Sequence, residues 1–338
     1  VRNDKRSQTM KVLVSGGAGY IGSHTVRELK NSGYDVVVLD TLELGHAEAV
    51  AGTRLIKGSI TDAALVEEVF MEEKPQAVMD FAAYKAAGES VGNPLKYFHN
   101  NVGGPVNLLE AMVRHEVPYY IFSSSCSVFG TPHNLPASET NNPFGPESPY
   151  GESKLTVEKM LGWVDKAYNL RYAALRYFNA AGASLDGTIG EDWTHTYNLV
   201  PLVLKAALGL TPSVKVFGTD YPTPDGSAVR DYIHVVDLAQ AHVKALEYLM
   251  RTNTSNAFNL GTGQGSSVKE VIDTAIRVSQ RDIQVELVGR RPGDPAAIWA
   301  DASKAERELG WKAQYDLETI IQTAWNWHSQ HPHGFDQE

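Results

Sequence analysis

Cysteine, long apolar runs and positive charge are all scarce in this 338-residue sequence, and each scarcity excludes a class of protein. The single cysteine, Cys126, rules out an internal disulfide, which suits a reducing compartment such as the cytoplasm. No run of about 18 apolar residues occurs, so we expect no membrane-spanning helix. The formal net charge of -10 argues against nucleic acid or an acidic membrane as the main partner.

The two ends of the chain are polar. The first nine residues lack the apolar stretch of a signal peptide, so we expect a loose, disordered leader over residues 1–9 before a fold that begins at Met10. Near the other end, His328, His331 and His333 match no common spacing of metal ligands. We therefore predict no metal site there and a frayed tail.

The first half of the sequence alternates short apolar runs with helical stretches. The predicted strands cover residues 11–15, 36–39, 54–57, 77–81, 119–123 and 172–177, and the predicted helices cover 20–31, 62–73, 95–115 and 150–168. This alternation predicts an α/β fold with a Rossmann-type, doubly wound parallel sheet and helices on both of its faces.

The second half has a different character. Connections rich in Gly, Pro, Asp and Thr occur at 182–192 and 218–226, and long connections between short elements are typical of a binding lobe. Helices are predicted at 199–208, 237–250, 268–278 and 317–327. We expect residues 10–180 to form the sheet domain, residues 181–338 to form mainly a smaller α/β substrate-binding lobe, and elements around 230–260 to return to the sheet.

A glycine-rich turn directly follows the first predicted strand. The glycines of Gly16-Gly-Ala-Gly19-Tyr20-Ile21-Gly22 permit a tight turn, close approach of backbone N–H groups to a pyrophosphate, and packing of the next helix. Asp40 ends the second strand, where a carboxylate suits the ribose hydroxyls of NAD and repels the extra phosphate of NADP. This context favours an NAD site over a glycine turn without a ligand.

Two further motifs are expected near such a cofactor. Ser123 and Ser125 lie at the end of the fifth predicted strand, and doubly wound sheets bind ligands at the carboxyl ends of their strands. Tyr150 and Lys154 lie one turn apart on a predicted helix. A nearby ammonium favours the phenolate, so we expect Lys154 to lower the pKa of Tyr150 and make it a base. By itself, this spacing also occurs by chance on many helices.

Together these motifs resemble the extended short-chain dehydrogenase/reductase superfamily, and within it the UDP-hexose 4-epimerase family. The resemblance extends from about Met10 to about Gly334. Besides the glycine turn and the Tyr150–Lys154 pair, it is carried by residues 81–85, 88–90, 100–102, 123–125, 175–179, 190–192, 217–223, 229–235, 259–261 and 290–294. It implies a cytoplasmic, homodimeric isomerase of galactose metabolism that uses NAD.

The resemblance also implies a reaction without net redox. Tyr150 would take the proton of the sugar 4-hydroxyl, with Lys154 as its pKa partner and Ser125 sharing the proton, while a hydride leaves C4 for NAD. The resulting 4-keto sugar would turn over in the pocket and take the hydride back on its other face. UDP-glucose and UDP-galactose would be interconverted in this way.

Binding residues follow from the same resemblance. The implied cofactor contacts are Gly16, Gly19, Tyr20, Ile21, Gly22, Asp40, Ser59, Ile60, Phe81, Ala82, Ala83, Lys85, Asn100, Ser123, Tyr150, Lys154, Tyr177 and Phe178. The implied UDP-sugar contacts are Ser125, Tyr150, Asn179, Asn198, Leu199, Phe217, Arg230, Arg291, Asp294 and Ile298. Planar arginine side chains suit a diphosphate because they make paired, charge-assisted hydrogen bonds, although either arginine could instead belong to an ordinary ion pair.

The sequence departs from the pattern of the family at Ser59, Pro105, Phe129 and Ile298, and two of these positions bear on binding. Ser59 stands where an acid that touches the adenine is usual, and Asp62 is a candidate substitute for it. Ile298 stands beside the sugar's 2-substituent, where a large aromatic residue restricts the family to unacetylated sugars and a small residue admits N-acetyl sugars. We therefore predict good turnover of UDP-glucose and UDP-galactose and weak turnover of N-acetyl sugars.

Alternative functions stay open at this point. The enzyme could be a 4-epimerase of another UDP-sugar, namely an N-acetylhexosamine, a pentose or a hexuronate, although we place no extra cation for a hexuronate carboxylate. A non-catalytic NAD-binding regulator is expected to lack Tyr150 or Lys154. A 4,6-dehydratase needs an acid–base pair beside the serine, and Ser125-Cys126-Ser127 supplies none. Cys126 is interpreted as a small packing residue.

The implied homodimer predicts a four-helix interface built from the helices at 95–115 and 150–168. The apolar candidates for that interface are Leu109, Met112, Leu155 and Met160. The alternative is that these four side chains face only the sheet of their own chain.

Overall fold

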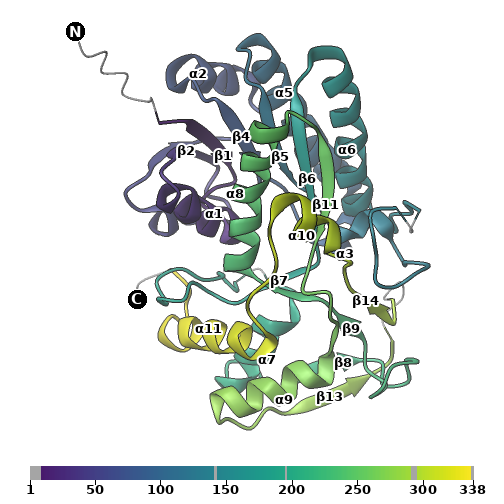
Figure 1. The fold of residues 1–338 in the computed structure, drawn as a ribbon. Helices are drawn as coiled ribbons and strands as arrows, with labels where there is room; N and C mark the ends of the chain where they lie inside the picture. The colour runs from purple at the N-terminus through teal and green to yellow at the C-terminus, as the bar shows by residue number, and fades with distance from the viewer. Residues whose placement is uncertain (1–8, 141–142, 195, 291–294, 336–338) are drawn as a thin grey trace.

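The computed structural model describes residues 9–140, 143–194, 196–290 and 295–335, so most of the predicted leader lies outside the described residues. A seven-stranded parallel sheet in the order β11-β6-β5-β4-β1-β2-β3 forms its centre (Figure 1). Its strands are β1 (Lys11–Ser15), β2 (Asp35–Asp40), β3 (Arg54–Lys57), β4 (Ala77–Asp80), β5 (Tyr119–Ser123), β6 (Arg171–Tyr177) and β11 (Asn256–Leu260). The predicted doubly wound sheet is confirmed.

Helices cover both faces of this sheet. One face carries α1 (Tyr20–Asn31), α8 (Val235–Thr252) and α10 (Ser303–Leu309), and the other carries α2 (Ala63–Glu73), α5 (Gly104–Arg114) and α6 (Pro149–Tyr168). Alternate residues of a strand point to opposite faces, so Val12 and Val14 of β1 join the first apolar layer and Leu13 joins the second. Burial on both faces explains why the strands are continuous apolar runs.

The prediction of one continuous helix over residues 95–115 was wrong. The stretch 95–115 is divided into α4 (Pro94–Phe98), a π-helical turn (His99–Gly103) and α5, and a short helix that the sequence did not predict, α3 (Ala87–Gly92), precedes it. The apolar spacing continues across the break, which is why a single helix was predicted. The wide π turn re-aims the side chains on it, and such turns are frequent at functional sites.

The lobe after β6 contains two strand pairs and one three-stranded sheet, all of short strands. These are β7 (Asn179–Ala181) with β10 (Tyr232–His234), β8 (Val214–Phe217) with β13 (Val285–Val288), and β9 (Val229–Arg230) between β12 (Ser266–Ser267) and β14 (Ala297–Ile298). The predicted helices here match α7 (Leu199–Ala207), α9 (Val268–Ser279) and α11 (Leu317–Gln330). In the described part of the chain, no helix is long and apolar enough to cross a membrane.

The prediction of a frayed C-terminal tail was wrong. His328 is buried and stacks on Trp193 with ring centroids 3.9 Å apart, and His331 stacks on Trp327 at 4.0 Å. The indole of Trp193 also donates a hydrogen bond to the carbonyl of Pro332 at 3.0 Å. The tail is ordered because two flat indole faces hold residues that look polar in the sequence.

The prediction that four apolar side chains are exposed at a dimer interface was also wrong. Leu109, Met112 and Leu155 are buried in the core of their own chain, and Met160 is half-buried against the layer under α5 and α6. The alternative in which these residues face the sheet therefore holds for Leu109, Met112 and Met160, whereas Leu155 packs against Val128 and Phe129 in the turn after β5. Both helices are apolar on more than one side, so periodicity alone does not identify the outer face.

Candidate active site

Two cavities meet at the glycine turn, where the carboxyl ends of the strands lie. The larger one, about 430 Å³, is lined by Asp40, Ser59 and Asn100, and the smaller one, about 160 Å³, is lined by Tyr150 and Lys154. Both cavities are also lined by Gly16, Gly19, Leu44, Phe81 and Ala83. Every predicted cofactor residue except Phe178 lines at least one of the two cavities.

The glycine turn is shaped for close approach. Gly16 has a φ of +69°, and a Cβ there would lie 2.6 Å from the backbone nitrogen of Ala82. A Cβ at Gly22 would lie 2.2 Å from the carbonyl oxygen of Gly16. Among the described residues no side chain caps α1, which leaves its first N–H groups and its positive dipole end for a ligand. This cradle fits a pyrophosphate.

Asp40 is fixed at the rim of the larger cavity. Its carboxylate accepts hydrogen bonds from the backbone nitrogens of Ala18 and Leu42, each at 2.9 Å. A carboxylate held in this way beside the glycine turn fits the ribose of NAD.

Ser59, which follows the neighbouring strand β3, also lines the larger cavity. The Ser59 hydroxyl lies 2.7 Å from that of Thr61, and both residues line the cavity. Asp62 instead caps α2, because its carboxylate accepts the backbone nitrogens of Ala64 and Leu65. Within the described residues Asp62 lines neither cavity, so Asp62 is not the substitute that we considered.

The π-helical turn supplies the wall beside Ser59. Asn100 lines the larger cavity, while Asn101 is buried next to it. The Asn101 side chain accepts a hydrogen bond from the nitrogen of Tyr84 at 2.9 Å and donates to the Tyr84 carbonyl at 3.0 Å. It also donates to the hydroxyl of Ser153 on α6 at 3.3 Å. The wide turn thus joins the cofactor cavity to the helix that carries Tyr150.

Tyr150 and Lys154 line the smaller cavity together but do not form a direct pair. The Lys154 ammonium donates to the Ser123 carbonyl at 2.7 Å and lies 6.0 Å from the centroid of the Tyr150 ring. Burial raises the pKa of Tyr150, and a hydrogen bond with Ser125 opposes that rise. The expected lowering of the Tyr150 pKa was therefore wrong, because burial raises that pKa.

Lys154 keeps its charge through buried carboxylates. Burial lowers its pKa to about 8, and the charges of Asp80 and Glu158 act in the opposite direction. Asp80 ends β4 and accepts hydrogen bonds from the hydroxyls of Ser15 at 2.7 Å and Tyr120 at 2.6 Å. Sequence reasoning missed Asp80, although an acid at the end of a buried strand beside β1 was the available signal.

Ser123 at the end of β5 and Ser124 after it point in different directions. Ser123 lies on the cavity side, with its hydroxyl 2.6 Å from that of Tyr177. Ser124 points the other way and donates to buried Glu158 at 2.5 Å. The Ser125 hydroxyl accepts from the backbone nitrogen of Ser127 at 3.1 Å and caps a short 3₁₀ turn. The strand ends at Ser123, and among the described residues Ser125, a predicted catalytic residue, lines neither cavity.

Two of the predicted substrate residues, Arg230 on β9 and Ile298 on β14, are register partners. Ile298 is buried and packs with Phe178 and with partly buried Cys126. Phe178 therefore lies against the predicted sugar side rather than in the cofactor cavities, and Cys126 is a packing residue as interpreted. The amide of Asn179 donates to the Asp231 carbonyl at 3.1 Å, which places it beside Arg230.

The remaining predicted substrate residues lie on separate elements. Asn198 precedes α7 and its amide donates to Glu191 at 3.4 Å, Leu199 begins α7, and Phe217 ends β8. Arg291 and Asp294 lie outside the described residues.

The outer wall of the smaller cavity was not predicted. It is formed by His46, Gly190, Glu191, Asp192 and Phe335. The Lys85 ammonium, a predicted cofactor contact, lies 3.4 Å from the Glu191 carboxylate on this wall. Residues 190–192 carried the resemblance without an assigned role, so the sequence signal was present but not used.

Comparison with known proteins places this geometry in a family. The NAD dependent epimerase/dehydratase family matches residues 12–261. The UDP-glucose 4-epimerase of Halalkalibacterium halodurans is 48% identical over 330 residues, which cover 97% of this chain and 98% of that protein.

Solved structures agree with the sequence match. The crystal structure of UDP-glucose 4-epimerase from Brucella ovis in complex with NAD has a TM-score of 0.91 and 46% identity, covering 94% of this chain and 98% of that one. The enzyme from Bifidobacterium longum in complex with NAD+ and UDP has a TM-score of 0.91 and 43% identity, covering 96% and 100%. This chain belongs to the NAD dependent epimerase/dehydratase family.

Proposed function

We propose that this enzyme interconverts UDP-glucose and UDP-galactose by transient oxidation at sugar C4 and thereby serves galactose metabolism. The observation that carries the proposal is that Tyr150 shares one cavity with Lys154 and the glycine turn. The relatives that match over nearly the whole chain are named UDP-glucose 4-epimerases, which supports the same reaction.

The protein's part in this reaction is proton transfer and orientation. When bound, NAD supplies the hydride acceptor and donor and a positive ring that favours the Tyr150 phenolate. Tyr150 takes the proton of the 4-hydroxyl, and Ser125 relays or shares it. Lys154 stays largely charged at neutral pH because Asp80 and Glu158 oppose the effect of burial. The 4-keto sugar then turns over and receives the hydride on its other face.

UDP recognition falls to the lobe. The Arg230 guanidinium donates to the Val229 carbonyl at 2.9 Å. This hydrogen bond fixes one edge of the planar guanidinium on the strand next to Ile298. A planar guanidinium suits the diphosphate because it makes paired, charge-assisted hydrogen bonds. We assign Arg291 the same role from its sequence position.

A direct test uses purified protein, UDP-galactose and no added NAD. Conversion to UDP-glucose without accumulation of NADH is the expected result, because the cofactor is restored at each turnover. Formation of NADH in proportion to substrate consumed would contradict the proposal and indicate a dehydrogenase. No turnover even with added NAD would favour a non-catalytic regulator.

Ile298 is the residue that we expect to set the sugar range. It is 6% exposed and packs against Phe178 and Cys126, so a change in its volume is felt at the wall of the sugar site. We expect Ile298→Ala to raise kcat/KM for UDP-N-acetylglucosamine relative to UDP-glucose about tenfold or more, because a few methylene groups shift discrimination by roughly 10–200-fold. Coupled assays on both sugars measure this ratio.

A matched control is available for this prediction. Ile283 is also buried, at 7% exposed, but belongs to the core around α7, α9 and α11. Ile283→Ala should leave the ratio between the two sugars unchanged. If Ile298→Ala alters kcat/KM for both sugars by the same factor, Ile298 does not select the sugar.

We propose that the enzyme is a homodimer joined through α3, α4 and α6. These neighbouring helices expose Val91 (65%), Leu95 (79%) and Trp163 (70%), which are large apolar side chains that a monomer rarely leaves in water together.

We expect a Leu95→Asp/Trp163→Glu double variant to sediment as a monomer, whereas the unaltered enzyme sediments at twice the chain mass. Burying two charges in the apolar interface is the physical reason. Leu287→Glu, an equally exposed leucine on β13 in the lobe, is the control and should remain dimeric. A monomeric unaltered enzyme would contradict the proposal.

A further inference from the structure

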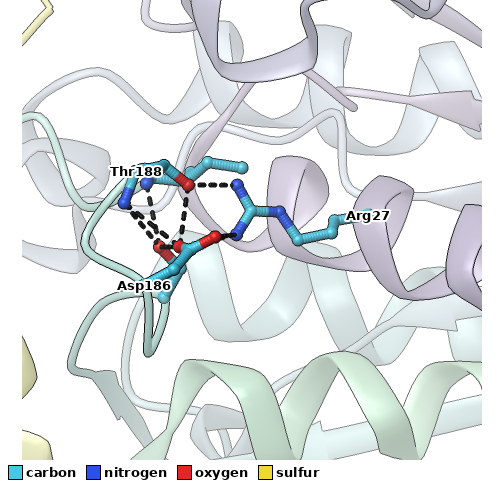
Figure 2. Close-up of polar contacts among 5 residues, drawn as sticks. Arg27, Asp186 and Thr188 are labelled. Carbon is cyan, nitrogen blue, oxygen red and sulfur yellow. Dashed lines mark hydrogen bonds and ion pairs between the residues drawn. The ribbon is translucent and has the colours of Figure 1, made fainter.

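The connection between β7 and α7 lies over the helix that follows the glycine turn. We call residues 182–192 the strap. Its first residue accepts a hydrogen bond through the Gly182 carbonyl from the Tyr20 hydroxyl at 2.6 Å. Further along, Arg27 of α1 donates to Asp186 at 2.9 and 3.1 Å and to the Thr188 hydroxyl at 2.5 Å (Figure 2). The strap therefore lies along α1, where Tyr20 at the start of the helix and Arg27 in its middle hold it by hydrogen bonds.

The far end of the strap reaches the outer wall of the smaller cavity. The Asp192 carboxylate lies 2.6 Å from the Nε2 of His46, and both side chains are about one-fifth exposed, at 19% and 22%. His46 is itself tied to the glycine turn, because its backbone nitrogen donates to the Ala18 carbonyl at 3.0 Å. The His46–Asp192 contact thus joins the loop after β2 to the strap across the cofactor cavity.

The C-terminal turn closes the same contact from outside. The Phe335 ring stacks on His46 with centroids 4.7 Å apart and an interplanar angle of 23°. It also lies 5.0 Å from the Trp327 ring, whose indole donates to the Glu191 carbonyl at 3.1 Å. Strap, loop and tail therefore meet at one place, and His46, Asp192 and Phe335 all line the cavity.

We propose that His46, Asp192 and Phe335 form a latch that retains NAD in the enzyme. This inference rests on the proposed function, because a cofactor that is restored at each turnover can serve many turnovers when it stays bound. The latch consists of protein–protein contacts between segments that are far apart in the sequence. It acts on the path between the cavity and solvent, and its opening limits how often NAD can leave.

The test measures NAD release from the holoenzyme in the absence of any UDP-sugar. Holoenzyme carrying isotopically labelled NAD is mixed with excess unlabelled NAD, and the loss of protein-bound label gives the dissociation rate. Dilution of the holoenzyme to equilibrium gives Kd. We expect His46→Ala and Phe335→Ala each to raise the dissociation rate about tenfold or more, because a charge-assisted contact or a ring stack is lost.

The two measurements separate a latch from a direct cofactor contact. A latch slows entry and exit alike, so Kd should change by less than about threefold while the dissociation rate rises. A Kd that rises in proportion to the dissociation rate overturns the latch and makes these residues ordinary contacts. An unchanged dissociation rate in both variants also overturns it.

The experiment includes a control variant outside the latch and two separate variants within it. Arg277→Ala removes an exposed ion pair with Glu318 between α9 and α11, away from both cavities, and should release NAD at the unaltered rate. Phe335→Ala changes a residue near the end of the chain, so it remains informative if His46→Ala does not fold. Because no sugar is present, an incorrect substrate assignment would leave these results unaffected.

Discussion

Tyr150→Phe should fold, retain NAD and lose most of its epimerase activity, with kcat lower by about 10²–10⁴-fold. The change removes one hydroxyl group, and that hydroxyl is the atom that we assign as the base. The ring itself fills the wall of the smaller cavity, and phenylalanine keeps that shape. Initial rates at saturating UDP-galactose measure the loss, and absorbance of the purified protein measures bound NAD.

The control for Tyr150→Phe is Tyr119→Phe. Tyr119 begins β5, the strand whose other end carries Ser123, so its hydroxyl lies at the edge of the sheet opposite the cofactor cavities. This variant should keep full activity and the same thermal stability as Tyr150→Phe. If Tyr150→Phe retains more than about a tenth of the activity, the loss is too small for removal of the base, and another group takes the proton.

The Tyr150 result also bears on what the sequence could and could not predict. The spacing from Tyr150 to Lys154 correctly placed both side chains at one cavity. It did not predict that Lys154 would donate to the Ser123 carbonyl, or that burial would dominate the pKa of Tyr150. Burial depends on neighbours from β5 and β6, and no local pattern reports those neighbours.

The fold was predictable where the signal was local. The glycine turn, β1 and Asp40 are fixed within one βαβ unit, and the structure places them as expected. The π-helical turn was not predictable, because its cause is tertiary: Asn101 bonds to Tyr84 and Ser153, which come from other parts of the chain. The ordered tail was missed for a similar reason, since the partner of His328 is Trp193.

The second large effect concerns a buried ion pair that holds α6 against the sheet. Arg176 of β6 and Glu158 of α6 are both buried, and Nε of Arg176 donates to the two carboxylate oxygens at 2.9 and 3.2 Å. Ser124 supplies another hydrogen bond to Glu158 at 2.5 Å. The Arg176 guanidinium also lies 4.8 Å from the centroid of the Phe144 ring. The buried charges of Arg176 and Glu158 are therefore stabilised by each other and by the groups around them.

We expect Arg176→Met to lower the free energy of unfolding by about 3–5 kcal/mol, because it leaves Glu158 as an uncompensated buried charge. Urea denaturation followed by circular dichroism measures the change. The control is Arg277→Met, which breaks an ion pair that is 57% and 63% exposed and should cost about 1 kcal/mol or less. Equal losses in the two variants would contradict the prediction, since burial is what distinguishes the pairs.

The double variant Arg176→Met/Glu158→Leu separates stability from function. Removing both charges together should recover most of the lost stability, because neither partner is then left unpaired in the core. Activity should not recover in the same way. The Glu158 charge raises the pKa of Lys154, which burial already lowers to about 8, so its loss moves that pKa further down. The alkaline limb of the activity–pH profile should therefore shift to lower pH in the double variant, while Arg277→Met leaves the profile unchanged. A stable double variant with an unaltered pH profile would mean that the pair only packs α6 and that the charge of Lys154 does not limit the reaction.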